Sequence, residues 1–570
     1  MQDPEQVASK LREIGALLRF TQAPKFKQLA YETAADVVKT VGDELGPLVE
    51  QDRLRELAGI GPSLSRQIQE LWNTGSSAYL DRLRSEAPEG AAELIQIEGL
   101  TPRRIRALHD ALGVRSIDDL RAACAAQRVR HVPGFGEKTE ARLCAACERW
   151  LQRTEAAPPR ILLAHALELA DVLRQELDKV VSGVHLAGAL RRGEETLGDL
   201  ELLVVGDRER ALEQLASLRR VLRVERDTGI VHLSGGLKLT LHATQDALGT
   251  ALVAATGNAA HVASLNQRAS ERGFALEAAA ASTSLPFRTF SNEPELYDAL
   301  GLAFVPPELR NGSGEVELAT RSNFDDLLEL GDITGMVHCH TTYSDGKNSI
   351  EEMARAAHEL GMQFITITDH SPSAHYASGV TLERLKQQWD EIAAVQERVP
   401  IRILRGTESD ILSDGLLDFP DSVLEQFDVV IASIHARHRM DRATMTNRLE
   451  TAMALPIFKI WGHALGRILN HRAPIDCDVP RVLDALAASR GAVEINADPH
   501  RLDLPPEWIP AARARGLPFI VSVDAHSTNG LQVLRYGVTM ARRGGLRKRE
   551  VLNTLPADVF SARVRPASAE

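Results

Sequence analysis

Two histidines and an aspartate lie within a few positions of one another in the segment VHCHTTYSDG, at residues 337–346. His338 and His340 are two residues apart, so in a β-strand both side chains would point to the same face and could bind one ion. Asp345 follows shortly after a turn. Two polar residues at the end of an ordinary strand would give the same pattern, so the rest of the chain has to decide between these interpretations.

Ligand-type side chains also end six further short segments in the last third of the chain. The segments are apolar or β-branched and lie about thirty residues apart, the length of one β-α unit. Repeated β-α units form a parallel barrel or an open sheet, with functional groups at the carboxyl ends of the strands. Histidines or acids at seven successive strand ends indicate a polynuclear metal site, and they are His338, His340, Asp369, His370, Glu408, His435, His463, Glu494, Asp524 and His526.

The length and composition describe a multidomain globular protein. A chain of 570 residues exceeds what one hydrophobic core supports, so we expect about three to five domains. Neither an apolar run of membrane-spanning length nor a secretory leader is found, and five scattered cysteines fit a reducing cytoplasm. We therefore expect a cytoplasmic monomer with no membrane partner. The net charge of −12 argues only weakly against nucleic acid, because the distribution of charge matters more than its sum.

A short motif recurs three times in the first third of the chain, at intervals of about 35 to 40 residues. Each copy (LAGIGPSLSRQI, IEGLTPRRIRAL and VPGFGEKTEARL) has an apolar lead, a turn with glycine and a helical pattern. Such a turn leaves backbone N–H groups free at a helix N-terminus, where phosphate can bind. The copies resemble the helix-hairpin-helix motif, which holds nucleic-acid backbone without reading sequence. This resemblance favours DNA binding over a simple connection of helices, through Gly59, Gly61, Gly134 and Gly136, whereas the middle copy has Thr101 in place of its second glycine.

The middle third resembles the nucleotidyltransferase palm of family X DNA polymerases. In VHLAGALRRGEETLGDLELLVVG, a G-[SA]-x-R-R-G motif precedes G-D-x-[DE] on a predicted strand. Asp199 and Glu201 on that strand face one way and could hold a divalent ion, although an ordinary strand edge gives the same pattern. The resemblance implies that Gly188 and Arg192 contact nucleotide phosphate, and that Mg²⁺ or Mn²⁺ binds weakly at the palm.

The order of segments along the whole chain resembles the bacterial family X DNA polymerases, in which helix-hairpin-helix repeats, palm and thumb precede a polymerase-and-histidinol-phosphatase (PHP) domain. The resemblance implies a multidomain fold with an α-helical helix-hairpin-helix N-terminal region, an α+β nucleotidyltransferase palm and thumb, and a C-terminal α/β PHP domain, a distorted (β/α)7 barrel. The expected domains are residues 1–85 (helix-hairpin-helix), 86–155 (fingers-like tandem helix-hairpin-helix), 156–250 (palm), 251–318 (thumb), 319–332 (linker) and 333–570 (PHP phosphoesterase).

The resemblance to the PHP family also assigns roles at the predicted strand ends. Asp369, Glu494 and Asn496 are expected to orient metal ligands. Arg467 and Arg437 are candidates for holding phosphate, although arginines on such loops are often only surface residues. Nine positions match the family's ligands, enough for three divalent ions, and mixed imidazole and carboxylate ligation suits Zn²⁺ or Mn²⁺. The nine expected ligands are His338, His340, Asp345, His370, Glu408, His435, His463, Asp524 and His526.

A polynuclear site of this kind suits the hydrolysis of phosphate esters, because neighbouring metal ions activate water and stabilise the attacking and leaving oxygens. Fusion to DNA-binding repeats makes gapped or 3′-ended DNA, bound without sequence preference, the expected partner. The predicted activity is metal-dependent hydrolysis at a DNA 3′ end, that of a 3′–5′ exonuclease in DNA repair. Two alternatives remain open: a working gap-filling polymerase with a proofreading nuclease, and a non-catalytic DNA-binding scaffold with structural metals.

The palm is predicted to be degenerate as a polymerase centre. Two-metal nucleotide transfer needs three carboxylates, and the strand KLTLH has Thr240 at the third position. The alternative is a shifted strand alignment in which Asp246 supplies the third acid. Four positions of the nucleotide pocket also differ from the family's usual residues, and they are Ala189, Ala254, Ala255 and Val262.

Overall fold

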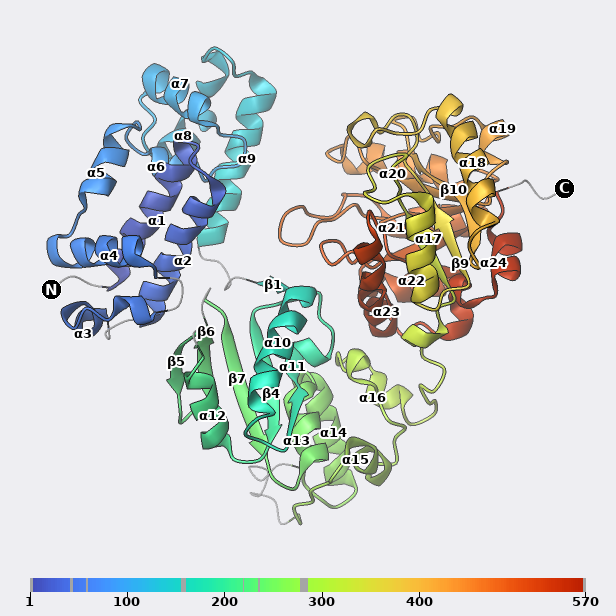
Figure 1. Cartoon of the computed structure of the whole chain (residues 1–570), viewed down its shortest axis with the longest axis horizontal. Coiled ribbons are helices and arrows are strands. Elements are labelled where there is room, and N and C mark those ends of the chain that lie inside the picture. The colour runs from blue at the N-terminus through green and yellow to red at the C-terminus, as the bar shows by residue number, and fades with distance from the viewer. Residues whose placement is uncertain are drawn as a thin grey trace. The chain divides into compact units, whose positions relative to one another are not determined.

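The computed structural model describes residues 4–41, 45–57, 60–154, 160–218, 220–233, 236–276 and 285–566 (Figure 1). The chain divides into two units. The first comprises Met1–Arg160, Ala170–His185 and Gly198–Gln245, and the second comprises Ile161–Leu169, Leu186–Leu197 and Asp246–Glu570. None of the described helices is long and apolar enough to cross a lipid bilayer.

Helices and turns make up the described N-terminal part of the first unit. Their apolar faces pack into two clusters, one around Leu11 and one around Ile105. Pro62 and Pro102 begin α4 and α7, at a helical position where the missing N–H has no intrahelical partner to lose. The helices are α1 (Pro4–Phe20), α2 (Lys25–Val41), α3 (Leu45–Glu50), η2 (Leu54–Glu56), α4 (Pro62–Thr74), α5 (Ala78–Ser85), α6 (Ala91–Leu94), α7 (Pro102–Leu112), α8 (Ile117–Ala125), η3 (Val129–His131) and α9 (Glu137–Thr154).

A five-stranded sheet in the order β2-β4-β7-β6-β5 forms the palm. Its pair β4–β7 is parallel, and its register sets Glu201 directly opposite Thr240. A separate antiparallel pair, β1 with β3, belongs to the second unit. The palm elements are β1 (Ile161–Leu162), α10 (Leu163–Leu177), β2 (Gly183–Leu186), α11 (Gly188–Arg191), β3 (Thr196–Leu197), β4 (Asp199–Val205), α12 (Arg208–Ala216), β5 (Val221–Glu225), β6 (Ile230–Leu233) and β7 (Lys238–Thr244).

The thumb is a small helical cluster of the second unit, with a core that includes Leu265 and Leu296. Beside this core, the buried Glu293 carboxylate lies 2.6 Å from the guanidinium nitrogens of both Arg191 and Arg310. Burial raises the pKa of Glu293, but the two arginine cations lower it by more, so the pKa lies below its ordinary value. The elements are α13 (Leu248–Thr256), α14 (Ala259–Glu271), α15 (Glu293–Ala299), η5 (Pro307–Leu309) and α16 (Glu315–Leu318).

Seven parallel strands form the C-terminal barrel, each hydrogen-bonded to the next in chain order from β8 to β14. The ends of the sheet approach each other, because Ala525 N donates to His338 O and His340 N donates to Ala525 O, at 3.0 and 2.9 Å. The predicted seven-fold β-α barrel is therefore confirmed. The strands are β8 (Gly335–Cys339), β9 (Phe364–Ile367), β10 (Arg402–Asp410), β11 (Val429–Ser433), β12 (Lys459–Trp461), β13 (Gly491–Asn496) and β14 (Phe519–Ser522).

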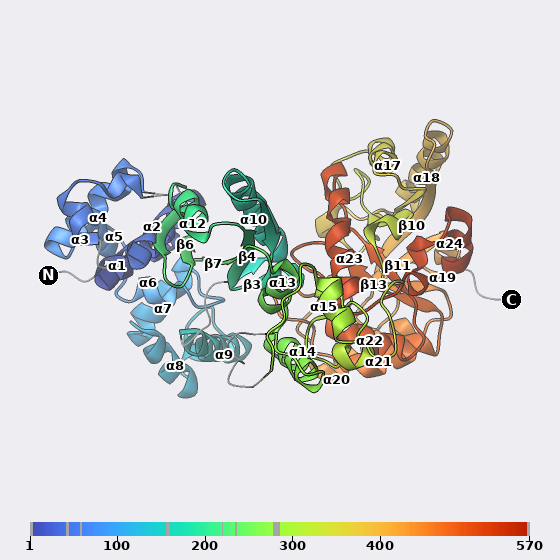
Figure 2. The same ribbon diagram turned by 90° about the horizontal axis from the view of Figure 1, so that it is seen from below.

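Helices surround the barrel strands, as Figure 2 shows for α17, α18, α23 and α24 around β10, β11 and β13. The amphipathic helix α17 begins with a capping box formed by Ser349 and Glu352. Phe560 of α24 stacks on Phe364 of β9, with ring centroids 4.5 Å apart. The elements are η6 (Leu330–Asp332), α17 (Ile350–Glu359), η7 (His375–Ala377), α18 (Leu382–Gln396), α19 (Asp421–Leu424), α20 (Arg442–Met453), α21 (Val479–Ala487), η8 (Pro506–Trp508), α22 (Ile509–Arg513), η9 (Thr528–Val533), α23 (Leu534–Arg543), η10 (Lys548–Glu550), η11 (Leu552–Thr554) and α24 (Ala557–Val564).

Candidate metal centre

Nine ligand-type side chains converge at the carboxyl ends of the barrel strands. They form four overlapping groups, and within each group the donor atoms lie within 4.8 Å of one another. The structure thus brings together all nine ligands expected from the sequence. The groups are His340, Asp345, His370 and His526; His338, His340 and Asp524; His338, Glu408 and His463; and His370, Glu408 and His435.

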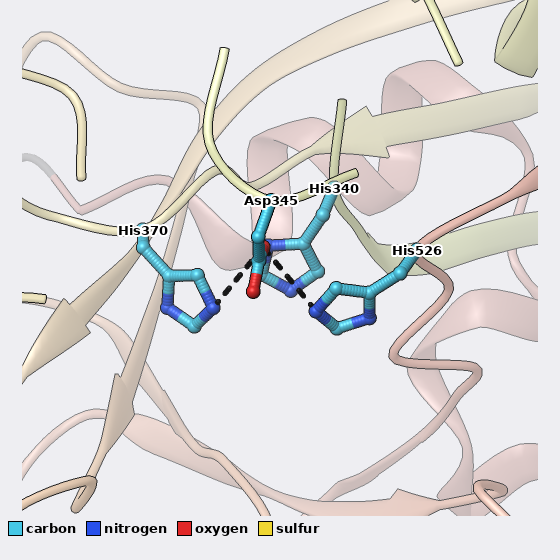
Figure 3. A group of neighbouring side chains, drawn as sticks. All are labelled: His340, Asp345, His370 and His526. Carbon is cyan, nitrogen blue, oxygen red and sulfur yellow. Dashed lines mark ion pairs between the residues drawn. The ribbon is translucent and has the colours of Figure 1, made fainter. Parts of the chain in front are cut away.

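The first of these groups surrounds Asp345 (Figure 3). Its carboxylate Oδ1 lies 3.4 Å from His526 Nε2, 3.6 Å from His370 Nε2 and 3.9 Å from His340 Nδ1. Two ligands of one Zn²⁺ ion, each at about 2.1 Å, stand roughly 3 to 4 Å apart, so these separations suit a shared ion. Burial raises the pKa of the Asp345 carboxyl, but the surrounding imidazoles lower it by more, so the net effect is a pKa of about 2.

Glu408 on β10 occupies the centre of the site, with a side chain that is only 1% exposed. Its two carboxylate oxygens lie 2.8 Å from His463 Nε2, 2.9 Å from His370 Nδ1 and 3.2 Å from both His338 Nε2 and His435 Nε2. Burial raises the pKa of Glu408, but these imidazoles lower it well below its usual value. A carboxylate with neighbours on both oxygens has the geometry of a bridging ligand.

Several polar atoms of these residues are buried and make no hydrogen bond, because even the short contacts between the imidazoles and Glu408 at these atoms lack hydrogen-bond geometry. A buried polar atom that lacks a partner costs about 1–3 kcal/mol, so a cluster of them within one site is unusual. Imidazole nitrogens and carboxylate oxygens are also the donor atoms that Zn²⁺ and Mn²⁺ accept. The residues present therefore fit a metal centre. The atoms are His338 Nε2, His340 Nδ1 and Nε2, His370 Nδ1, Glu408 Oε2 and His463 Nδ1.

The backbone leaves regular strand geometry where several of these residues lie. His338, His463 and Asp524 have φ angles of 66°, 24° and 49°. Such values are uncommon for residues with a side chain, and they concentrate at functional sites. The register of β8 also shifts between Met336 and Cys339. His338 and His340 nevertheless lie in one donor group with Asp524, as their spacing predicted, although a bulge or irregularity interrupts the regular pleat of β8 at this point.

Two carboxylates fix the orientation of predicted histidine ligands by contacting their Nδ1 atoms. Glu494 Oε1 lies 2.6 Å from His338 Nδ1, and Asp410 Oδ1 lies 2.5 Å from His435 Nδ1. Such partners set the tautomer and the direction of a ligating imidazole. Sequence reasoning found Glu494 but missed Asp410. The missed signal was its position two residues after Glu408 on one strand, since that spacing places both side chains on the same face.

Asp369 organises the loop that carries Asp345. Its carboxylate accepts hydrogen bonds from Thr341 N at 2.7 Å, Thr341 Oγ1 at 2.6 Å, Ser344 Oγ at 2.5 Å and Gln388 Nε2 at 2.7 Å. All of its acceptor capacity is directed at this loop and at α18. The contacts agree with an orienting role for Asp369 beside the metal ligands.

A cavity of about 230 Å³ is lined by seven of the nine predicted ligands, all except His338 and His340. Besides predicted ligands, its lining includes Tyr376, His438, Arg472 and Arg501. The Arg501 Nε lies 3.6 Å from Asp524 Oδ2, so a cation lies beside one of the predicted ligands. Sequence reasoning missed these four residues, because they lie on loops or, for Tyr376, in the short helix η7, whose paths no periodic pattern indicates.

The two arginines expected to hold phosphate are not among the residues that line this cavity. Arg467 donates to Glu195 Oε1 at 2.6 Å, to Arg501 O at 2.9 Å and to Leu502 O, which uses its guanidinium within the protein. Arg437 lies on the exposed loop after β11. In this structure Arg472 and Arg501 are the arginines that line the cavity.

The predicted palm site is sparser than the barrel site. Asp199 is exposed at the start of β4, and Glu201 Oε2 lies 2.9 Å from His242 Nε2 on β7. Among the described residues, no group of three metal-binding donors includes Asp199 or Glu201. Asp246, the alternative third acid, lies in a bend after β7 has ended.

The two remaining palm residues expected to contact nucleotide lie in the second unit. Gly188 begins the short helix α11, and the Arg192 guanidinium donates to Thr256 O at 2.6 Å and contacts Glu194. Arg192 is thus engaged with α13 of the thumb.

The glycines of the helix-hairpin-helix repeats face open space. A Cβ atom built on Gly61, Gly134 or Gly136 would meet no atom of the described residues within 4 Å, apart from those of its chain neighbours, and Gly134 has a φ of 87°. Internal packing therefore does not require glycine at positions 61 and 136, whereas close approach by an external group would. In the middle repeat, Thr101 caps α7 by accepting from Arg104 N. Gly59 lies outside the described residues.

Comparison with protein families finds four matching models along the chain. A helix-hairpin-helix domain matches residues 3–77, a SAM-like helix-hairpin-helix tandem residues 91–149, a DNA polymerase beta thumb residues 251–311, and a PHP domain residues 337–498. These models appear in the order expected from the sequence.

Individual proteins of known name are similar to the whole chain or to its barrel. A probable phosphatase of Caldanaerobacter subterraneus is 32% identical over 28% of this chain and 60% of its own. A probable histidinol-phosphatase of Deinococcus radiodurans is 27% identical over 33% of this chain and 85% of its own. The DNA polymerase/3′-5′ exonuclease PolX of Bacillus subtilis is 36% identical over 93% of both chains. The chain therefore belongs to the PolX family of bacterial family X DNA polymerases with a C-terminal PHP domain.

Proposed function

We propose that this chain hydrolyses DNA phosphodiesters from 3′ ends at the barrel metal centre, as a 3′–5′ exonuclease of DNA repair. The observation that carries the proposal is the convergence of nine donor residues around Glu408, beneath a cavity that also presents Arg472 and Arg501. The printed name of the Bacillus subtilis relative, which includes a 3′-5′ exonuclease, supports the same activity.

Three divalent ions, Zn²⁺ or Mn²⁺, are proposed to occupy the centre. The four overlapping donor groups support more than one ion, and the mixture of imidazoles and carboxylates supports these metals. Bound there, the ions would lower the pKa of an attacking water and stabilise charge on the phosphate. The chain's own residues do the rest: Glu494 and Asp410 hold His338 and His435 in position.

Cationic residues of the cavity are proposed to receive the scissile phosphate. Arg501 and Arg472 both line the cavity beside the carboxylates of the centre. Their positive charge would attract the negative charge of a phosphodiester as the substrate approaches Glu408 and Asp524. Charge-assisted hydrogen bonds of this kind fix both the position and the orientation of a phosphate.

DNA is a better candidate substrate than a small phosphomonoester. The open glycine turns at Gly61 and Gly136 support binding of a phosphate backbone at helix N-termini, without sequence preference. Both regions match helix-hairpin-helix models. All five cysteines are free thiols, which supports action in a reducing cytoplasm.

The palm is proposed to be degenerate for nucleotide transfer. Thr240 lies opposite Glu201 where a third carboxylate would be needed, and Glu201 is paired with His242. The competing proposal is a working gap-filling polymerase with a proofreading nuclease. The thumb match and the relative's printed name, which includes a DNA polymerase, favour this alternative.

One assay separates these proposals. Purified protein is incubated with Mn²⁺ and a gapped, labelled primer, with and without deoxynucleotides. We expect the primer to shorten in both cases, and to stay intact when a chelator is added. Efficient lengthening with nucleotides would favour the polymerase, and shortening that persists in chelator would overturn the metal-dependent nuclease.

A further inference from the structure

Two short segments of the palm region belong to the same unit as the barrel. They are Ile161–Leu169 and Leu186–Leu197. The segments are joined to each other by the β1–β3 pair, and Leu163 N donates to Glu195 O at 3.0 Å. The second segment also contains the G-A-L-R-R-G motif, for which the degenerate palm gives no evident use.

These segments contact the barrel through Glu195, His165 and Gly193. Glu195 Oε1 lies 2.6 Å from Arg467 Nη2, and the two side chains are 21% and 8% exposed. The rings of His165 and His500 meet edge to face, with centroids 6.5 Å apart. Gly193 lies so close to α23 that a Cβ atom on it would stand 2.2 Å from a methyl carbon of Thr539. The ion pair is the contact most directly connected to the metal centre.

Arg467 also binds the loop that carries Arg501, so it connects Glu195 to this loop. Its Nε donates to Arg501 O at 2.9 Å, and its Nη2 donates to Leu502 O. The backbone N–H groups of Leu465 and Arg467 donate to the Asp503 carboxylate, at 3.0 and 3.3 Å. One guanidinium therefore joins Glu195 to two successive carbonyl groups of the 498–504 loop.

Arg501 is the residue of this loop that reaches the cavity. Its side chain lines the cavity and lies 3.6 Å from Asp524 and 3.8 Å from Asp498. The backbone carbonyl of Arg501 is the group that Arg467 holds. A change in the position of the Arg467 guanidinium would therefore move the backbone from which Arg501 extends.

We infer that Glu195 is a positioning residue for hydrolysis, which acts through Arg467 to keep Arg501 directed at the phosphate in the cavity. The inference rests on the proposed nuclease function, and it gives the palm segment a role in the barrel's reaction. Without the Glu195 carboxylate, the nearly buried Arg467 cation loses its short ion pair and the 501–502 backbone loses a fixed anchor. Neither Glu195 nor Arg467 belongs to the predicted ligand set, so the change removes no donor atom from the centre.

Steady-state kinetics of the full-length protein test this inference. Glu195→Gln keeps the size of the side chain and removes its charge, and Glu194→Gln, one residue earlier, is the matched control. Each variant is assayed with Mn²⁺ on a 3′-ended oligonucleotide and on bis(4-nitrophenyl) phosphate, and its metal content is measured. We expect Glu195→Gln to lower kcat/KM about tenfold through a higher KM, with metal content unchanged and Glu194→Gln near wild type.

A double-mutant cycle with Arg501→Ala distinguishes positioning from a general structural role. If Glu195 acts through Arg501, adding Glu195→Gln to Arg501→Ala causes no further loss. An equal loss in both backgrounds, or a fall in metal content with Glu195→Gln alone, would overturn the inference. A wild-type protein that cleaves only bis(4-nitrophenyl) phosphate would refute the DNA nuclease, and the same cycle on that substrate would still decide the role of Glu195.

Discussion

The barrel rim and the palm strand β4 both present acids that could bind metal, yet only the rim assembles a dense site. At the rim, Glu408 has four imidazoles within 3.2 Å. In the palm, Asp199 is exposed, and Glu201 faces Thr240 and contacts a single histidine. A closed parallel barrel delivers the ends of seven strands to one place, whereas a site on two neighbouring strands depends on a few positions. One substitution can therefore remove the ability of the palm site to bind metal, whereas the rim retains many ligands after the loss of one.

Removal of a rim ligand is the strongest way to test this contrast. We expect His340→Ala or Asp524→Ala to lower DNA 3′-end hydrolysis by more than about a hundredfold, since loss of an orienting partner alone costs about 10–100-fold. DNA binding should persist, because the repeats supply it. Asp199→Ala should leave primer shortening unchanged. Shortening that survives both rim substitutions, or that disappears with Asp199→Ala, would reverse the comparison.

A smaller loss is expected from Asp410→Asn, which leaves every predicted ligand in place. Asp410 lies 2.5 Å from His435 Nδ1, so the substitution should weaken metal affinity about tenfold to a hundredfold. Titration of chelator-treated protein with Zn²⁺ or Mn²⁺ measures this effect. Asp414→Asn changes an exposed acid in the loop that follows β10 and serves as the control. Equal affinities for the two variants would mean that Asp410 does not support the centre.

DNA affinity should depend on the repeats and not on the rim. Gly61→Val with Gly136→Val would place side chains where a phosphate would approach, and apart from the adjacent residues no described part of the chain lies within 4 Å of their Cβ positions. We expect about tenfold weaker DNA binding, equivalent to about 1.4 kcal/mol, with unchanged thermal unfolding. Fluorescence anisotropy at several salt concentrations measures the affinity. Gly331→Val, at an equally open glycine near the barrel, is the control, and a similar loss there would contradict the assignment.

The barrel should also differ from the helical repeats in how its stability responds to pH. Burial, with the nearby Arg490 cation, lowers the pKa of Lys459 on β12 to about 7, below its ordinary 10.5. Between these values the unfolded chain binds a proton that the folded chain does not, so stability rises with pH, by about 1 kcal/mol per pH unit. The contribution of Lys459 is isolated by comparing thermal unfolding of the wild type and Lys459→Met between pH 7 and 10, because other groups of the barrel titrate in the same range. The stability of the wild type relative to the variant should rise with pH, and a constant difference would exclude this contribution.

The smallest expected effect is a gain in the palm. Thr240→Asp would place a third carboxylate opposite Glu201, so weak Mn²⁺-dependent primer extension should appear where the wild type has none. The altered positions Ala189, Ala254 and Ala255 keep this gain small. Gel analysis of primer length measures it. Efficient extension by the wild type, abolished by Asp199→Ala, would show that the palm is not degenerate.

The ligand set was predictable because its signal is local. Each apolar β run is followed by a histidine or an acid, and parallel strands bring such ends together whatever the loops do. The bulge at His338 did not matter to this prediction, since it changes the path of β8 but not which residue follows it. Asp410 could have been found from its spacing to Glu408.

The residues around the ligands were less predictable, because their places depend on loop paths and on contacts distant in sequence. Arg467 follows a strand end just as the ligands do, yet Glu195, 272 positions earlier, takes its guanidinium. Arg472 and Arg501 reach the cavity from loops with no periodic pattern. The position of Arg467 and Arg437 in the chain correctly indicated that they lie at the carboxyl ends of the barrel strands. It did not indicate which arginines line the cavity.

The position of Glu408 has a consequence for how the centre would fill with metal. Its two oxygens are shared among imidazoles that belong to different donor groups, so an ion bound in one group would fix the carboxylate for its neighbour. A second ion would then meet an ordered ligand, and its binding would cost less conformational freedom than that of the first. Loading should therefore be cooperative, with a sigmoidal dependence on free metal and few half-filled molecules. Activity would switch on over a narrow range of metal concentration.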